Sequence, residues 1–280
     1  MERRQIGVVK NLYRYPVKSM QGERLNAVDI TQQGVIGDRA YALREANGRV
    51  ITAKKWPNLL ECSAHYEAPP TPPALAPLRI TLPDGRTFLA QDPNASTVLS
   101  SVLEHSVILE RAQLNQHHRA EIDPATVFGD VPVETLKPGF TAATLPDSFA
   151  LPLGTFFDAA SLHVLASGTL AHLRTLTGED AQLDPRRFRP NIVIDTKPGL
   201  EGFLEDDWLD GSLDVGDGVS IVQLRPTVRC VMTTHRQAEL GRDRRILRAA
   251  AQHHDAQVGV WASIERPGTV RVGDPVVLVK

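Results

Sequence analysis

The residue best suited to bind a soft metal ion is Cys230, in the segment spanning residues 225–234. Arg229 precedes it directly, and positive charge beside a thiol favours the thiolate, which acts as a nucleophile, a redox group or a soft-metal ligand. A small buried core residue would fit the same pattern, because free cysteines are among the most frequently buried residues. Cys62 has no basic neighbour in the sequence, so we expect it to be part of the core.

Two basic groups in the N-terminal part of the chain could hold an anionic oxygen. Lys18 and Ser19 place a cation beside a hydroxyl group in the segment 15–22, and Arg39 follows the tight turn of residues 34–38. Charge-assisted hydrogen bonds from such groups bind phosphate and carboxylate oxygens. An ordinary hairpin with solvated basic residues would contain the same residue types.

Three arginines, Arg186, Arg187 and Arg189, lie within four positions directly before the apolar residues 192–194. Guanidinium groups repel one another unless an anion or a carboxylate lies nearby. The segment therefore predicts either an anion site or a structural turn in which carboxylates such as Asp184 pair with the arginines. The residues favour neither alternative over the other.

Composition and motifs argue against several classes of function. The 280 residues have a formal net charge of −2, whereas nucleic-acid binders concentrate positive charge. No apolar run is long enough for a membrane span, no signal peptide is evident, and the two cysteines do not suggest a secreted disulfide framework, so we expect a cytoplasmic protein without a membrane partner. The nine histidines form no zinc motif, and no nucleotide-binding glycine motif is present.

The elements that must position these residues are mostly short β-strands. Asn47-Gly48 and Asp84-Gly85 each separate two strand-like runs, which predicts two hairpins. Apolar spacing predicts short helices over residues 95–103, 168–176 and 244–253. Further strands are expected over residues 161–165, 192–194, 259–264, 269–272 and 276–279. We therefore predict a mostly β (α+β) fold in two domains, residues 1–125 and 126–280.

Taken together and in this order, the segments resemble the MOSC family, named for the C-terminal domain of molybdenum cofactor sulfurase, in the branch that includes the mitochondrial amidoxime-reducing component. Residues 15–22 and 34–39 are similar to the family's N-terminal β-barrel domain. Residues 187–194, 229–234 and 259–276 are similar to its core and closing strands. The resemblance implies a MOSC β-barrel core packed with an N-terminal β-barrel domain and a few short helices.

The resemblance also implies a molybdenum–molybdopterin cofactor. Cys230 matches the cysteine that binds molybdenum, which would make it the catalytic and metal-ligating residue. The residues that match the family's cofactor contacts are Lys18, Ser19, Arg39, Ser167, Thr169, Arg189, Asn191 and Arg229. Family members often carry a small polar residue or a cysteine two positions before the ligand, where this chain has Val228, so one cofactor contact is expected to differ.

The function implied by the resemblance is the reduction of N-hydroxylated or N-oxide compounds by a molybdenum-dependent oxidoreductase. The alternative is a protein that binds the cofactor without turnover, or a sulfur transferase that carries a persulfide on Cys230. Pyridoxal phosphate is not expected, because the aminotransferase-like domain that would hold it is missing. Two cysteines cannot form a four-cysteine iron–sulfur site, so we expect an external reductase or ferredoxin-like protein to supply electrons.

Overall fold

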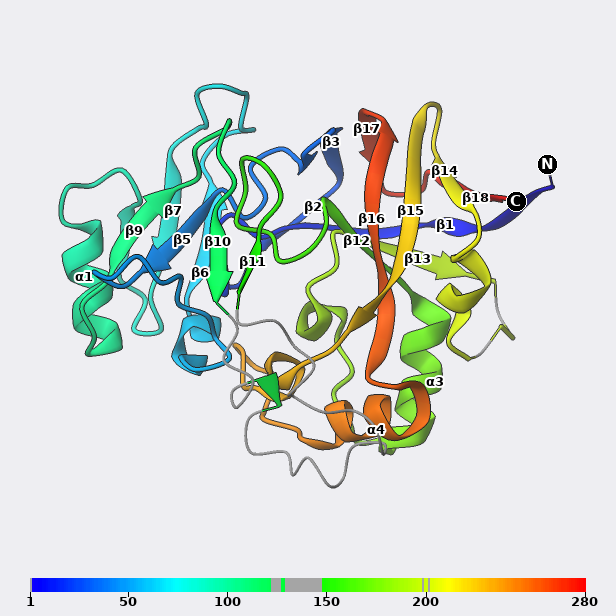
Figure 1. Ribbon diagram of the computed structural model, residues 1–280. Coiled ribbons are helices and arrows are strands. Elements are labelled where there is room, and N and C mark those ends of the chain that lie inside the picture. The colour runs from blue at the N-terminus through cyan, green and yellow to red at the C-terminus, as the bar shows by residue number, and fades with distance from the viewer. Residues whose placement is uncertain (1, 122–126, 129–147, 198, 201) are drawn as a thin grey trace.

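The computed structural model describes residues 2–121, 127–128, 148–197, 199–200 and 202–280. Its largest sheet has eight strands, and this sheet closes into a barrel because β1 pairs with β13 (Figure 1). Around the barrel the strands follow the order β13 (Ile192–Thr196), β12 (Leu162–Ala166), β16 (Gln257–Arg266), β15 (Val219–Val228), β14 (Ser212–Val215), β18 (Pro275–Val279) and β1 (Arg3–Arg14). β2 (Glu23–Leu25) pairs with β1 and lies outside the closure.

The barrel is stable because each strand contributes one row of apolar side chains to a common core. In β12, Leu162, Val164 and Ala166 belong to this core, and full burial of a large aliphatic side chain contributes about 1.5–3 kcal/mol. Side chains alternate between the two faces of a strand. His163 and Leu165 therefore point away from the barrel interior.

The first strand of the chain is part of this barrel. β1 pairs antiparallel with β13 and with β18, although both partners come from the second half of the sequence. The barrel is therefore not built from one continuous stretch of chain. The domain boundary predicted between residues 125 and 126 lies outside the described residues.

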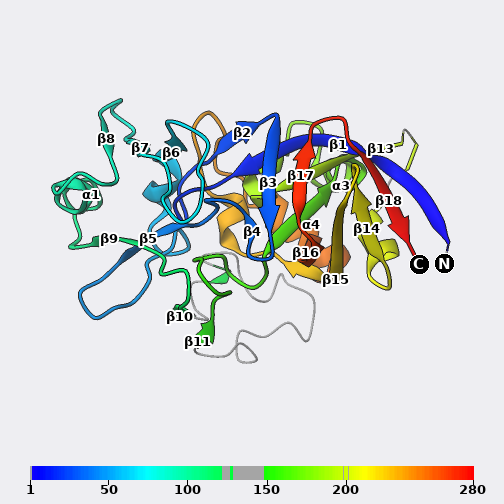
Figure 2. The same ribbon diagram turned by 90° about the horizontal axis from the view of Figure 1, so that it is seen from above.

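A second group of elements, called here the N-terminal lobe (residues 40–111), lies beside the barrel (Figures 1 and 2). Its strands are β5 (Tyr41–Arg44), β6 (Ser63–Tyr66), β7 (Leu78–Thr81), β8 (Thr87–Leu89) and β9 (Ile108–Arg111), and its helix is α1 (Ala95–Leu103). The remaining strands are β3 (Ala27–Thr31), β4 (Gly34–Val35), β10 (Arg119–Glu121), β11 (Ser148–Ala150) and β17 (Gly268–Arg271). The lobe has its own core, to which Leu78, Ile80 and Leu99 contribute.

The two predicted hairpins differ in outcome. Around Asp84-Gly85, β7 and β8 pair antiparallel, as expected. Around Asn47-Gly48 the turn forms, with Gly48 at φ +86°, but β5 pairs along its length with β9. Its predicted partner, residues 49–52, makes only an isolated bridge between Arg44 and Val50. The second arm nevertheless lies beside the end of β5, because the Ile51 N–H donates to the Leu43 carbonyl and the Glu45 N–H to the Arg49 carbonyl, each at 2.9 Å.

The predicted helices are confirmed to within one residue at each end. Helix α1 has the expected bounds, and the other two are α3 (Ser167–Thr177) and α4 (Arg245–His254). Helices α3 and α4 pack against each other and against the outer face of the barrel through Leu165, Leu173 and Ile246 (Figure 1). Within the described ranges, the helices lack the length and apolar character that crossing a membrane requires.

Candidate functional site

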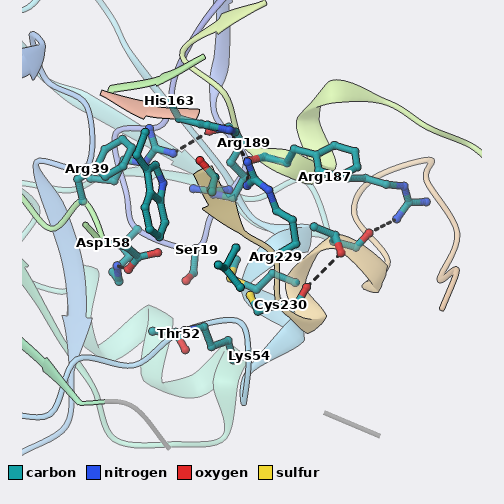
Figure 3. A pocket seen from close by; sticks show the side chains of 18 residues that line it. Ser19, Arg39, Thr52, Lys54, Asp158, His163, Arg187, Arg189, Arg229 and Cys230 are labelled. Carbon is teal, nitrogen blue, oxygen red and sulfur yellow. Dashed lines mark hydrogen bonds and ion pairs between the residues drawn. The ribbon is translucent and has the colours of Figure 1, made fainter. Parts of the chain in front are cut away.

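One cavity is lined by residues from the N-terminal lobe, the loop after β1 and the end of β15 (Figure 3). It brings together six residues singled out in the sequence: Lys18, Ser19, Arg39, Arg189, Arg229 and Cys230. The other polar residues that line it are Thr52, Lys54, Asp158, His163, Arg187, Thr227 and Thr233. Because several cations converge on one hollow, an anion is the class of ligand that the cavity suits best.

Three of the six residues have left-handed backbone conformations. Ser19 has φ +69°, Arg39 has φ +46° and Arg189 has φ +55°. Such values are uncommon for residues other than glycine and tend to occur at functional sites, where the surrounding structure imposes them. Ser19 and Arg39 lie in turns and Arg189 directly follows the 3-10 helix Pro185–Phe188, and all three residues line the cavity.

Arg39 and Arg189 both lie against one aromatic ring, that of Tyr15. Their guanidinium carbons are 4.5 and 4.3 Å from the centroid of the Tyr15 ring, and Arg39 also donates a hydrogen bond of 3.0 Å to the backbone carbonyl of Arg189. Burial, and then the nearby Arg39, lower the pKa of Arg189 to about 10. Two buried like charges held this close favour binding of an anion between or beside them.

Lys18 is buried and has one carboxylate partner. Its Nζ donates a hydrogen bond of 2.8 Å to the carbonyl of Phe156 and forms an ion pair with Asp158. Burial lowers the pKa of Lys18, although Asp158 opposes this shift. Burial would raise the pKa of Asp158, but Lys18 and then Lys54 hold it well below its usual range. Sequence reasoning missed Asp158, which lies 140 residues from Lys18 and has no distinctive motif around it.

Arg229 is held by the protein through most of its N–H groups. Its Nε donates to the carbonyl of Val258 at 2.7 Å and its Nη1 to that of Phe188 at 3.0 Å. Its Nη2 contacts the carbonyl of Val258 and Nε2 of His163. Burial lowers the pKa of Arg229 to about 9, so the group is still cationic at neutral pH. Arg229 therefore contributes fixed positive charge more than free hydrogen-bond donors.

The two cysteines occupy different environments. Cys230 is half-buried, lines the cavity and begins the 3-10 helix Val231–Thr234 directly after β15 (Figure 3). Cys62 is fully buried in the core of the N-terminal lobe. Burial raises the pKa of the Cys62 thiol to about 11. Of the two, only Cys230 is in a position to meet a ligand in the cavity.

The arginine cluster divides into structural residues and one residue with a free donor. Arg186 forms ion pairs with Asp184 and Glu239, which is the structural alternative weighed from the sequence. Arg187 is almost fully buried and donates to backbone carbonyls, at 3.0 Å to His235 and at 2.6 Å to Gly241. It therefore fixes the segment that follows Cys230.

Arg189 lines the cavity and has a buried guanidinium nitrogen without a partner among the described residues. Its Nη1 donates to the carbonyl of Met20 at 2.6 Å, while Nη2 has no hydrogen-bond partner among the residues that the structure describes.

Three other residues expected at the cofactor do not line the cavity. The Ser167 hydroxyl donates to Asp195 at 3.1 Å, and the Thr169 hydroxyl donates to Glu205. Asn191 is fully buried, accepts a hydrogen bond from the His163 backbone at 3.2 Å and donates to the carbonyl of Tyr13 at 3.3 Å. These side chains brace the strands around the site, because their polar groups already have partners within the protein.

The site depends on a close approach of backbone at Gly259, which has φ +78°. A Cβ atom at this position would lie 2.5 Å from Nε2 of His163 and 2.8 Å from the carbonyl oxygen of Val164. We expect Gly259→Ala to lower the free energy of unfolding by about 2–4 kcal/mol, because backbone strain and steric overlap add. Urea unfolding of the variant measures this loss.

The matched control is Gly48→Ala. Gly48 has φ +86°, but among the described residues no atom lies within 4 Å of a Cβ built there. Backbone strain alone should lower the free energy of unfolding of Gly48→Ala by about 1 kcal/mol. Equal losses of unfolding free energy in the two variants would show that steric overlap of a Cβ atom with His163 and Arg229 adds nothing to the backbone strain at Gly259.

Relatives align with nearly the whole chain. Mitochondrial amidoxime-reducing component 1 of Mus musculus is 26% identical over 98% of this chain and 83% of its own length. Mitochondrial amidoxime reducing component 2 of Bos taurus is 25% identical over 97% of this chain and 83% of its own length. Among solved structures, the YUAD protein from Bacillus subtilis aligns with a TM-score of 0.49 and 10% identity, over 99% of this chain and 97% of that chain.

Two family models divide the chain between them. The model of the MOSC N-terminal beta barrel domain matches residues 6–120, and that of the MOSC domain matches residues 153–277. Together they span most of the 280 residues. The mostly β fold with few and short helices agrees with the fold class expected from the sequence. The chain therefore belongs to the MOSC family, with a MOSC N-terminal beta barrel domain ahead of its MOSC domain.

Proposed function

We propose that the chain binds a molybdenum–molybdopterin cofactor in this cavity and uses it to reduce N-hydroxylated or N-oxide compounds. The observation that carries the proposal is that Cys230 shares one cavity with the cations Lys18, Arg39 and Arg189. A thiolate is a ligand for a soft metal, and the cations suit the phosphate of a pterin cofactor. Membership of the MOSC family and the printed names of the relatives support the same function.

The chemistry of the donors fits such a cofactor. In the described part of the chain, Arg189 Nη2 and Thr227 Oγ1 are buried without a hydrogen-bond partner, and both residues line the cavity. A buried polar group left without a partner costs about 1–3 kcal/mol. Phosphate or pterin oxygen atoms would supply the missing acceptors, so ligand binding would remove this cost.

Each residue then has a definite role. Cys230 ligates the metal, Arg39 and Arg189 bind the phosphate, and Lys18 with Ser19 completes the anion site. Arg229 supplies positive charge beside Cys230. We leave Ser167, Thr169 and Asn191 out of the set of cofactor contacts and assign them to the support of the strands.

The cofactor, when bound, supplies the two-electron chemistry that breaks the N–O bond, with two electrons and two protons converting an N-hydroxy compound to its amine and water. The chain binds and orients both ligands. Phe157, Val228 and Trp261 form an apolar part of the cavity wall, which suits the organic part of a substrate and limits the access of water.

We further propose that a separate reductase or ferredoxin-like protein supplies the electrons. The sequence contains two cysteines, too few for a four-cysteine iron–sulfur site. The relatives are named as components of an amidoxime-reducing activity, which fits a reaction shared with other proteins. A cytoplasmic location remains our expectation from the sequence.

The test is reduction of benzamidoxime to benzamidine by the cofactor-loaded protein with reduced methyl viologen as electron donor. We expect turnover that scales with molybdenum content, and none with a pyridine nucleotide as the only reductant. Fully loaded protein that leaves benzamidoxime and trimethylamine N-oxide unchanged would contradict the proposed reaction. Metal-free protein that accepts a persulfide on Cys230 would instead favour the sulfur-carrier alternative.

A further inference from the structure

A histidine that the proposed reaction does not use lies in the wall of the cavity. His163 is in β12, whose other side chains are all apolar, and is only 2% exposed. Because its strand neighbours Leu162 and Val164 fill the barrel core, the imidazole is directed to the opposite face, where the cavity lies. A polar ring buried at this position needs partners, and those partners are two of the site's arginines.

The first partner is Arg229. Its Nη2 contacts Nε2 of His163 at hydrogen-bond distance. A guanidinium group can only donate, so Nε2 must accept and therefore carries no proton. The ring is consequently neutral when this bond is made. Burial, and then Arg229, lower the pKa of His163 well below its usual value, in keeping with this arrangement.

The second partner is the backbone of Arg189, whose carbonyl, together with that of Val258, opposes the lowering of the His163 pKa. Because Nε2 accepts from Arg229, the proton of the neutral ring is at Nδ1. The Arg189 carbonyl also accepts a hydrogen bond of 3.0 Å from Nη2 of Arg39. Arg39, Arg189, His163 and Arg229 thus all lie in the wall of one cavity, with Arg39 bonded to the Arg189 carbonyl and His163 bonded to Arg229, the neighbour of Cys230 (Figure 3).

The backbone around His163 is held from two sides. Asn191 exchanges hydrogen bonds with it, since its side chain accepts from the His163 N–H at 3.2 Å and its own N–H donates to the His163 carbonyl at 2.8 Å. Gly259 leaves just enough space for the ring to reach Arg229. The position of the imidazole is therefore fixed by the fold, and the imidazole adds a side-chain contact to the backbone hydrogen bonds that hold Arg229.

We infer that His163 is a positioning residue, which holds the Arg229 guanidinium beside Cys230 and links it to the anion-binding residues Arg39 and Arg189. Its role in turnover rests on the proposed function, whereas its hold on Arg229 does not. Without His163 the Arg229 guanidinium would lose its contact with the imidazole and keep its hydrogen bonds to the carbonyls of Val258 and Phe188, so its charge would be held less firmly beside the metal ligand. We therefore expect a lower rate of the chemical step and little change in substrate affinity.

The first measurement uses the wild-type protein and requires no cofactor. In ¹⁵N-labelled protein, NMR should show His163 neutral with the proton on Nδ1, and the Nη–H signals of Arg229 should be protected from exchange. Assignment uses Arg229→Lys, which removes those signals. A proton found on Nε2 of His163 in the wild-type protein would overturn the inference whatever the protein catalyses.

The second measurement compares His163→Leu, which removes both ring nitrogens, with His163→Gln, which keeps an acceptor and a donor. The control is His172→Leu, a histidine of α3 that does not line the cavity and instead makes an edge contact with Phe203. At equal molybdenum content we expect His163→Leu to reduce the protection of the Arg229 Nη2 protons, which contact His163, and to lower kcat about tenfold with KM unchanged. His163→Gln should restore protection and most of kcat.

The outcomes separate the two proposals. If His163→Gln is as impaired as His163→Leu, or if His163→Leu keeps both Arg229 protection and kcat, His163 does not position Arg229. If wild-type protein fully loaded with cofactor reduces no N–O compound while the NMR results hold, the proposed function fails and the hold of His163 on Arg229 stands.

Discussion

Cys230→Ser is expected to abolish N–O reduction while leaving the fold intact. Loss of the groups that merely support metal ligands costs about 10–100-fold in affinity or activity, so replacing the ligand itself should cost on the order of a thousandfold or more. Serine offers a harder hydroxyl that stays protonated near neutral pH and is a poor ligand for a soft metal. Because Cys230 is half-buried at the edge of the cavity, the change should barely affect packing. The assay is benzamidoxime reduction at equal cofactor content, with circular dichroism to check the fold.

Cys62→Ser is the matched control. Cys62 is fully buried in the apolar core of the N-terminal lobe, so a hydroxyl group there should cost about 1–3 kcal/mol of stability. Its catalytic rate should be unchanged below the melting transition. Near-normal turnover by Cys230→Ser, or loss of turnover in a folded Cys62→Ser variant, would refute the assignment of Cys230 as the metal ligand.

Arg189→Met is expected to lower cofactor retention by about tenfold to a hundredfold, the loss that follows from one or two charge-assisted hydrogen bonds. Methionine keeps much of the side-chain volume but removes the charge and the unpaired Nη2 donor that line the cavity. The loss should appear as a lower molybdenum and pterin content after extensive dialysis. Stability of the cofactor-free variant should fall little, because burial already disfavours the arginine cation.

Arg186→Met tests whether this effect belongs to the site or to the cluster of arginines. Arg186 lies three positions away, is ion-paired with Asp184 and Glu239, and does not line the cavity. Partly exposed ion pairs contribute little to stability, and we expect normal cofactor content in this variant. Equal cofactor loss in Arg186→Met and Arg189→Met would remove Arg189 from the anion site.

Local sequence patterns predicted the helices and most strands because those elements follow from short-range periodicity. Helix α1 has the bounds that its apolar spacing indicates, and the β7–β8 hairpin follows from Asp84-Gly85. Pairing between distant strands was not predictable in this way. The partnership of β1 with β13 and that of β5 with β9 depend on the tertiary fold, which no dipeptide or local period encodes.

The candidate site was predictable in its residue types but not in its partners. The cations stood out by their charge and Cys230 by its basic neighbour, yet residue type alone did not distinguish Arg189 from Arg186. The distinction lies in their partners, since Arg186 pairs with the Asp184 carboxylate and Arg189 donates to the backbone carbonyl of Met20. Asp158 was missed because its partner Lys18 is far away in the chain. His163 did carry a signal, since it is the one polar residue in an otherwise apolar strand.

The residues that the resemblance to the MOSC family singled out most clearly, Cys230 and the cations, line one cavity, whereas the residues of its looser matches do not. Ser167 and Thr169 follow β12 as expected, yet their hydroxyl groups are bonded to Asp195 and Glu205. A sequence match gives the position of a residue along the chain. It does not show which face of the fold the side chain occupies or which groups compete for it.

The central claim, that this chain holds a molybdenum cofactor beside Cys230, is tested most directly by elemental and pterin analysis of the purified protein. Mass spectrometry of the metal and fluorescence of the oxidised pterin should give molybdenum and pterin in equal amounts, approaching one of each per chain when expression is supplied with molybdate. Arg189→Met should reduce both together. Protein that is free of molybdenum and pterin under these conditions, and that takes up neither from a cofactor donor, would contradict the account.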